Sequence, residues 1–166
     1  MGDVRVGVVG VGSWGFNHVR VFSELTGVKL VAIVDKKPER AREVALRFRV
    51  TWYTDTEEML RVEKPDAVTI ATPTSTHAEV ALLALEEGVH VLVEKPIART
   101  TREAIDMVKR ARRRGVILMV GHIERFNPAV RKAKELINEG EVGEVISASA
   151  RRLGMVWTLI TDVGVI

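Results

Sequence analysis

The stretch from Val4 to Gly15 constrains the fold of this chain most strongly. Its first half is a β-branched run, which is typical of a strand buried in a parallel sheet. Its second half has three glycines in G-x-G-x-x-G spacing, and a segment with helical periodicity follows. In this context the first glycine permits a tight turn, the second lets a pyrophosphate approach the backbone, and the third lets helix and strand pack closely. The loop is therefore predicted to bind a dinucleotide at the helix N-terminus. Its candidate residues are Gly10, Gly12, Ser13, Trp14 and Gly15.

A second predicted strand, residues 29–34, ends at Asp35, 20 positions after Gly15. A carboxylate here would accept hydrogen bonds from the adenosine ribose and repel the 2′-phosphate of NADP, which favours NAD as the cofactor. Lys36 and Lys37 can pair with that phosphate, so NADP stays possible. The alternative is a tight turn followed by a solvated aspartate. The order of strand, turn, helix, strand and acid favours the dinucleotide.

Strands alternate with helical segments along the rest of the chain. Further strands are expected at residues 51–53, 67–71, 89–93, 116–120 and 145–150. This alternation predicts an α/β fold with a doubly wound parallel sheet (Rossmann), strand order 3-2-1-4-5-6 and a ligand crevice at the carboxyl ends of the strands. Residues 1–150 are expected to form this dinucleotide-binding domain. Residues 151–166 form an apolar ending with no helix to cover it.

Composition excludes several classes of protein. The chain has no cysteine, hence neither disulfides nor thiolate metal sites, and no spacing typical of a metal site occurs. No long apolar run or signal peptide is present, so a cytoplasmic protein without membrane contact is expected. The net charge of +3 comes mostly from helix faces of mixed sign, which argues against a nucleic-acid partner. The lack of glutamine and the many charges suggest a thermophilic source.

Three polar clusters follow predicted strands at the expected crevice. They are Thr72–Pro73 with His77, Glu94–Lys95–Pro96, and the segment from His122 to Pro128. A lysine in a cleft can orient a substrate hydroxyl and share its proton, so Lys95 is the candidate catalytic and substrate-binding residue rather than a surface lysine. Glu94 is expected to hold the loop that carries Lys95 and to lie near the cofactor, without a catalytic role of its own.

The remaining polar residues have less specific interpretations. His77 is either a cofactor ligand or only a polar residue at a helix start. Arg125 and His122 can face the cofactor or the substrate, and Arg125 is the candidate substrate-binding residue. His18 and His90 are expected to have packing or structural roles.

Three segments resemble the Gfo/Idh/MocA oxidoreductases: "GVVGVGSWGFNHVR", "ATPTSTHAEVALLALEEGVHVLVEKPIA" and "GHIERFNPAV". The resemblance covers residues from Val4 to the end. It implies that the three glycines bind the pyrophosphate, that Asp35 binds the adenosine ribose, and that Thr72 and Pro73 line the nicotinamide ribose with His77 nearby. It also implies a catalytic or substrate-orienting Lys95. The form "GHIERFNP" is most similar to members that act on UDP-N-acetylglucosamine-type sugars.

The chain also departs from the family pattern. Family members continue into a second α/β domain that supplies most substrate contacts and the subunit interface. The ending "DVGVI" resembles the lead-in to that domain's D-x-x-x-H segment, so Asp162 is not expected to be catalytic. The resemblance implies an NAD(P)-dependent dehydrogenase that acts on sugars, cyclitols or sugar nucleotides. The full-length protein is expected to be a homo-oligomer, and the 166-residue chain alone is expected to be inactive. The alternative is a non-catalytic dinucleotide-binding module that senses redox state.

Overall fold

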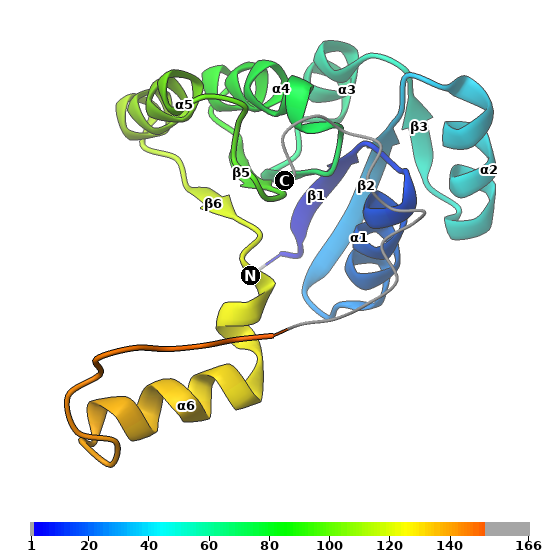
Figure 1. Cartoon of the computed structure of the whole chain (residues 1–166). Coiled ribbons are helices and arrows are strands. Elements are labelled where there is room, and N and C mark those ends of the chain that lie inside the picture. Colours follow the sequence, from blue (N-terminus) through cyan, green and yellow to red (C-terminus); the bar gives the residue numbers. More distant parts are fainter. Residues whose placement is uncertain (1, 152–166) are drawn as a thin grey trace. The chain divides into compact units, whose positions relative to one another are not determined.

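Six parallel strands form one sheet, as the β-branched runs of the sequence predict. In the computed structural model, which describes residues 2–151, their order is β3-β2-β1-β4-β5-β6, and the predicted order is confirmed (Figure 1). The strands are short, and most residues of β1, β2 and β4 are buried, as in a sheet covered on both faces, while the outer strands β3 and β6 are partly exposed. They are β1 (Val4–Val9), β2 (Val28–Val34), β3 (Thr51–Tyr53), β4 (Ala67–Ile70), β5 (His90–Val93) and β6 (Leu118–Val120).

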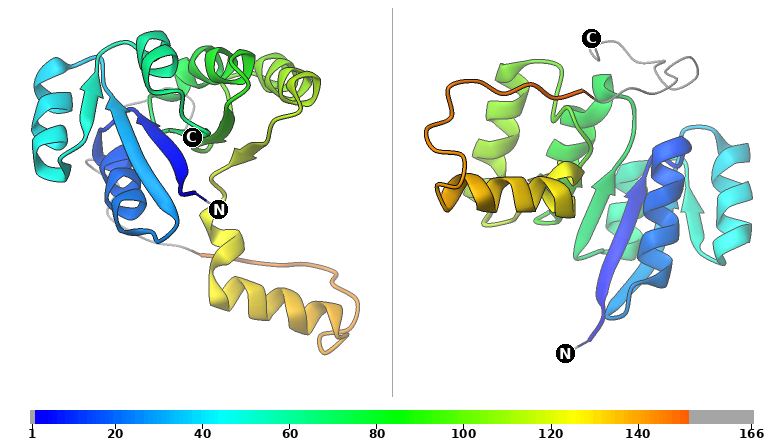
Figure 2. Two further views of the ribbon diagram at one scale, coloured as in Figure 1. Left: turned by 180° about the vertical axis from the view of Figure 1, so that it is seen from behind. Right: turned by 60° about the horizontal axis from the view of Figure 1, so that its bottom comes forward.

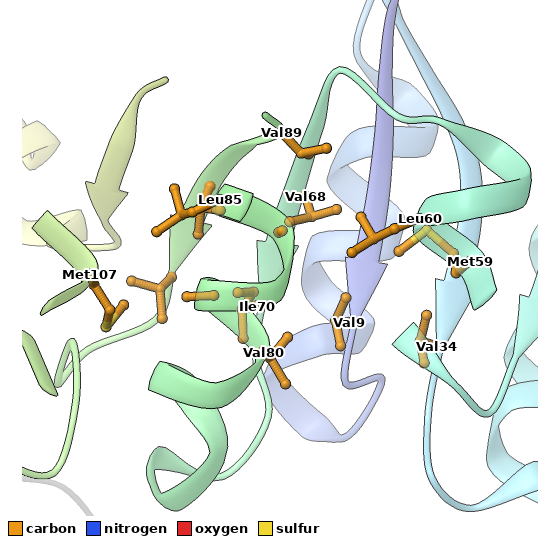
Figure 3. Packing of buried hydrophobic residues seen from close by; sticks show 14 of the residues in the cluster. Val9, Val34, Met59, Leu60, Val68, Ile70, Val80, Leu85, Val89 and Met107 are labelled. Atoms are coloured by element: carbon orange, nitrogen blue, oxygen red, sulfur yellow. The ribbon is translucent and has the colours of Figure 1, made fainter. Parts of the chain in front are cut away.

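Helices lie on both faces of this sheet, which makes it the doubly wound Rossmann fold. α1 (Ser13–Glu24) and α2 (Pro38–Phe48) cover one face around buried Val19, Ile33 and Val44. The other face is covered by α3 (Thr56–Glu63), α4 (Thr74–Glu86) and α5 (Thr101–Arg114). Figure 3 shows this larger cluster, which includes Leu85 and Met107 from the helices and Val68 and Ile70 from the strands. Burial of these apolar side chains at about 25 cal/mol per Å² supplies the main stabilisation of the domain.

Arginines near the end of α5 contact a carboxylate of the neighbouring helix. Arg110, Arg113 and Arg114 all donate hydrogen bonds to Glu86 of α4. This single carboxylate offsets one of the three positive charges. Among the described residues, none of the helices is long and apolar enough to cross a membrane.

The described chain forms two compact units that divide after Gly121. The second contains the short helix η1 (Ile123–Phe126) and α6 (Pro128–Asn138), both visible in Figure 2. Asn127 caps the start of α6, because its side chain accepts a hydrogen bond from the amide of Ala129 at 3.0 Å.

The predicted strand at residues 145–150 is wrong. These residues form no strand and are exposed. A strand needs a neighbouring strand for its backbone hydrogen bonds, and the described part of the second unit offers none. The expected lead-in beyond Arg151, with Asp162, lies outside the described residues.

Candidate dinucleotide site

The glycine loop closes tightly between β1 and α1. The amide of Gly10 donates to the carbonyl of Val34 at 2.8 Å, and Gly10 has a φ of +84°, which favours glycine. A Cβ on Gly10 would also lie 2.8 Å from the amide nitrogen of Thr72. Gly10 therefore brings the loop against the turn that follows β4.

Gly15 and Gly12 differ sharply in the space around them. A Cβ on Gly15 would lie 1.7 Å from the carbonyl oxygen of Gly10, so only glycine fits in this first turn of α1. A Cβ on Gly12 would meet nothing closer than a guanidinium nitrogen of Arg40, at 3.7 Å. The backbone at Gly12 is therefore open to a ligand. This open backbone beside the N-terminus of a helix fits a diphosphate.

Asp35 lies at the end of β2 and its carboxylate faces the glycine loop. One oxygen accepts from the amide of Val11 at 3.1 Å, and the other accepts from the amide of Lys37 at 2.9 Å. The side chain of Asp35 is only 8% exposed. The structure thus places the Asp35 carboxylate beside the glycine loop, while its contact with a ribose stays a prediction. Lys36 is exposed next to it.

Arg40 is a site residue that the sequence pattern did not indicate. Its guanidinium lies 3.3 Å from the Asp35 carboxylate. A hollow of about 280 Å³ lies between the glycine loop and α2. It is lined by Val11, Gly12, Ser13, Phe16, Arg40, Glu43, Val44 and Arg47. The sequence signal was available, because a side chain in the first turn of α2 points back towards the preceding strand end.

His77 joins two of the predicted clusters. Its ring nitrogens lie 2.8 Å from the Pro96 carbonyl oxygen and 2.9 Å from the Thr72 carbonyl oxygen, and the residue is 1% exposed. A neutral imidazole donates one hydrogen bond, so it fixes one carbonyl, and the imidazolium fixes both. The geometry favours a supporting role for His77 over direct contact with a cofactor. Thr72 accepts from the Thr76 hydroxyl at 2.9 Å, and Pro73 is exposed.

Glu94, Lys95 and Pro96 form the turn that follows β5. The Lys95 side chain is exposed, and the Lys95–Pro96 peptide bond is cis. One Glu94 oxygen lies 3.1 Å from Nε2 of His18, and the other accepts from the amide of Lys95 at 3.2 Å. The hydrogen bond from His18, followed by the Lys95 amide, lowers the pKa of the Glu94 carboxyl although its burial raises it. His18 was expected only to pack, but its ring also makes hydrogen bonds with two other side chains.

Comparison with known proteins identifies the chain. The family described as "Oxidoreductase family, NAD-binding Rossmann fold" (GFO_IDH_MocA) matches residues 4–122. The chain belongs to the Gfo/Idh/MocA oxidoreductase family. In this family member the matched residues contain all of the first unit's strands.

Two curated relatives illustrate the range of reactions in the Gfo/Idh/MocA family. UDP-N-acetylglucosamine 3-dehydrogenase of Acidithiobacillus ferrooxidans is 38% identical over 132 residues, which cover 80% of this chain and 41% of the relative. The 2,7-anhydro-N-acetylneuraminate hydratase of Mediterraneibacter gnavus is 36% identical, with 93% of this chain and 41% of the relative covered. The chain thus spans less than half the length of these relatives.

A solved structure of the family shows the same fold with ligands. Scyllo-inositol dehydrogenase from Lactobacillus casei, with bound NAD(H) and scyllo-inositol, superposes with a TM-score of 0.82 at 26% identity. The superposition covers 86% of this chain and 43% of the neighbour. This chain is therefore an NAD-binding Rossmann domain of the family.

The remaining polar residues lie outside the glycine loop. Arg125 and His122 belong to the second unit, so a role for Arg125 at the substrate stays a prediction. His90 accepts a hydrogen bond from the Ile117 amide at 3.0 Å, in agreement with its expected structural role. The described residues include no cluster of side chains suited to a metal ion.

The lowered pKa of Glu94 predicts a pH-dependent stability. Because the folded pKa lies below the ordinary value of 4.5, Glu94 stabilises the fold above that pH, and this contribution is lost as the pH falls through the folded pKa. Glu94→Gln should therefore flatten the acid limb of the stability curve. Urea unfolding of wild type and variant between neutral and acid pH measures this. Parallel curves would contradict the prediction.

Proposed function

We propose that this chain is the dinucleotide-binding part of an NAD(P)-dependent dehydrogenase that oxidises a hydroxyl group of a sugar, a cyclitol or a sugar nucleotide. One observation carries the proposal. The glycine loop, Asp35, the Thr72–Pro73 turn and Lys95 follow β1, β2, β4 and β5, which are consecutive neighbours in the sheet. Parallel strands place their carboxyl ends along one edge, where ligands of such sheets bind.

Each of these residues has a proposed part in the reaction. The open backbone at Gly12 and the N-terminus of α1 hold the diphosphate, and Asp35 accepts hydrogen bonds from the adenosine ribose. Thr72 and Pro73 line the nicotinamide ribose. Bound NAD supplies the hydride acceptor. Lys95 orients the substrate hydroxyl through a hydrogen bond and takes part in the removal of its proton.

The relatives support a proposal about the domains and the substrate. Since they are more than twice as long as the matched region, we place residues 1–150 in the dinucleotide-binding domain and residues 151–166 at the lead-in to a substrate domain. That domain supplies a second proton-handling group and the contacts of a homo-oligomer. Among the substrate classes, the UDP-N-acetylglucosamine type is the first to test. A cytoplasmic location and a thermophilic source stay predictions from composition.

A substrate panel tests the proposed function. NAD reduction is followed with inositols, hexoses, glucosides and UDP-sugars, using this chain and a version extended through the following domain. We expect turnover only from the extended version. Activity of the 166-residue chain alone would contradict the placement of the second group. NAD binding by the extended version without any turnover would favour the non-catalytic module.

Cofactor preference gives a separate prediction. The buried Asp35 carboxylate should make NAD(H) bind more tightly than NADP(H), because its charge opposes the 2′-phosphate. Asp35→Ser should weaken NAD binding about tenfold and reduce the difference in affinity between NAD(H) and NADP(H). Arg40→Met, which removes the cation beside Asp35, should increase that difference. Calorimetry with both cofactors measures these changes, and tighter NADP(H) binding by the wild type would show that the Asp35 argument is wrong.

A further inference from the structure

A chain of three polar side chains links α1 to β4 and to the turn that carries Lys95. Thr69 lies on β4 and is fully buried, His18 lies on α1, and Glu94 follows β5. His18 Nδ1 lies 2.7 Å from Thr69 Oγ1, and His18 Nε2 lies 3.1 Å from Glu94 Oε1. The side chains of His18 and Glu94 are 15% and 14% exposed. Polar groups in such a setting are costly unless they are paired, so this is a built network.

The chemistry of the three groups sets the direction of the hydrogen bonds. An ionised carboxylate only accepts, so His18 Nε2 must donate to Glu94. In the neutral ring Nδ1 then accepts, and the Thr69 hydroxyl donates to it. Glu94 thus selects the tautomer with its N–H on Nε2, and the Thr69 hydroxyl supplies the donor that this tautomer needs at Nδ1.

Glu94 is held from further directions. Its second oxygen accepts from the amide of Lys95 at 3.2 Å. A Cβ on Gly121, just after β6, would lie 3.1 Å from Glu94 Oε1, so the absence of a side chain there leaves room for the carboxylate. The titratable groups that face Glu94 are His18 and the adjacent Lys95. The orientation of this carboxylate therefore depends on His18 and sets the backbone at Lys95.

We propose that His18 is a positioning residue that holds the Glu94 carboxylate and, through it, the Lys95 turn. This inference rests on the proposed function, because it assigns to His18 a part in placing the proposed catalytic lysine. His18 lies on the helix that begins at the glycine loop, so the same element contacts the diphosphate and supports the lysine. The cofactor helix and the Lys95 turn are thus joined by one side chain.

Two substitutions of His18 separate its two hydrogen bonds. The amide of asparagine can reach the position of Nδ1, so His18→Asn keeps a partner for Thr69 and loses the donor to Glu94. The longer glutamine places an amide near Nε2, so His18→Gln keeps that donor. His90→Asn is the matched control, since His90 supports Ile117 away from this network. Thr69→Val is a further variant that leaves both His18 and Glu94 in place.

Hydrogen exchange of the Lys95 amide and the carbon-13 titration of the Glu94 carboxyl report on the network without cofactor or turnover. A hydrogen bond to a charged group is worth roughly a tenfold or larger factor in an equilibrium constant. We therefore expect the Lys95 amide to exchange about tenfold faster in His18→Asn. The Glu94 pKa should rise towards its ordinary value in the same variant. His18→Gln and His90→Asn should stay close to wild type, and Thr69→Val should show a smaller change in the same direction.

Turnover of the extended enzyme gives the functional readout. His18→Asn should lower kcat about tenfold while the KM for NAD stays within about threefold, and His18→Gln should restore kcat. Equal exchange and titration in wild type, His18→Asn and Thr69→Val would overturn the proposal. So would a loss of activity shared equally by the asparagine and glutamine variants. Because the NMR measurements need no ligand, they can succeed even if the proposed dehydrogenase activity is absent.

Discussion

Gly12→Val is expected to abolish NAD(H) binding while the domain keeps its fold. A Cβ at this position meets no protein atom closer than 3.7 Å, the end of the Arg40 side chain, so the backbone leaves room for a side chain to begin here. The same side chain fills the space through which the diphosphate approaches the backbone. NADH fluorescence should show no saturable binding, and the melting temperature should change by no more than a few degrees, roughly 1 kcal/mol. Normal NADH binding by a folded variant would mean that the glycine loop is not the diphosphate site.

Gly15→Ala is the matched control for this substitution, and its expected result is the opposite. A single methyl group would lie 1.7 Å from the Gly10 carbonyl oxygen, so the loop or the start of α1 must move. Overpacking of this kind typically costs about 1–3 kcal/mol, and a clash with backbone lies at the upper end. The variant should melt well below wild type. Together the two variants distinguish the proposed binding role of Gly12 from the packing role of Gly15.

Lys95→Met should nearly abolish turnover of the extended enzyme. Lys95 is exposed at the end of β5, and the turn that carries it is held by Glu94 and His77, so its side chain can be changed without disturbing the core. Loss of a general acid or base typically lowers the rate about 10²- to 10⁴-fold. The fall should appear in kcat, with NADH affinity of this chain unchanged.

Lys109→Met on α5 is a suitable control for Lys95→Met. Lys109 is exposed on an outer helix and belongs to none of the proposed site clusters. Its substitution should leave kcat unchanged. A Lys95→Met enzyme that retains full kcat would remove Lys95 from the proposed mechanism.

Most of the fold followed from sequence because its signals were local. The β-branched runs, the glycine spacing and the caps each act within a few residues, and the rules for parallel crossovers then leave few arrangements. The strand predicted at 145–150 was wrong for the converse reason. An alternating pattern shows that a segment can form a strand, but the partner strand is a property of the tertiary structure.

The site was predicted unevenly for similar reasons. Gly10, Gly15 and Asp35 were predicted from their order along the chain, and the structure places them close together at the carboxyl ends of β1 and β2. The contacts of His18 with Thr69 and Glu94 span 51 and 76 residues of sequence, so no local pattern could reveal them. Thr69, a polar residue inside an apolar strand run, was the available hint.

The central claim is that the crevice at the carboxyl ends of β1, β2, β4 and β5 binds NAD(H). Titration of NADH into the nitrogen-15-labelled 166-residue chain, followed by amide chemical shifts, tests this most directly. We predict saturable shifts concentrated at Val11–Gly15, at Asp35–Lys37 and around Thr72, with none at the outer helix α5. Saturable shifts confined to other surfaces, or no binding at millimolar NADH, would contradict the account.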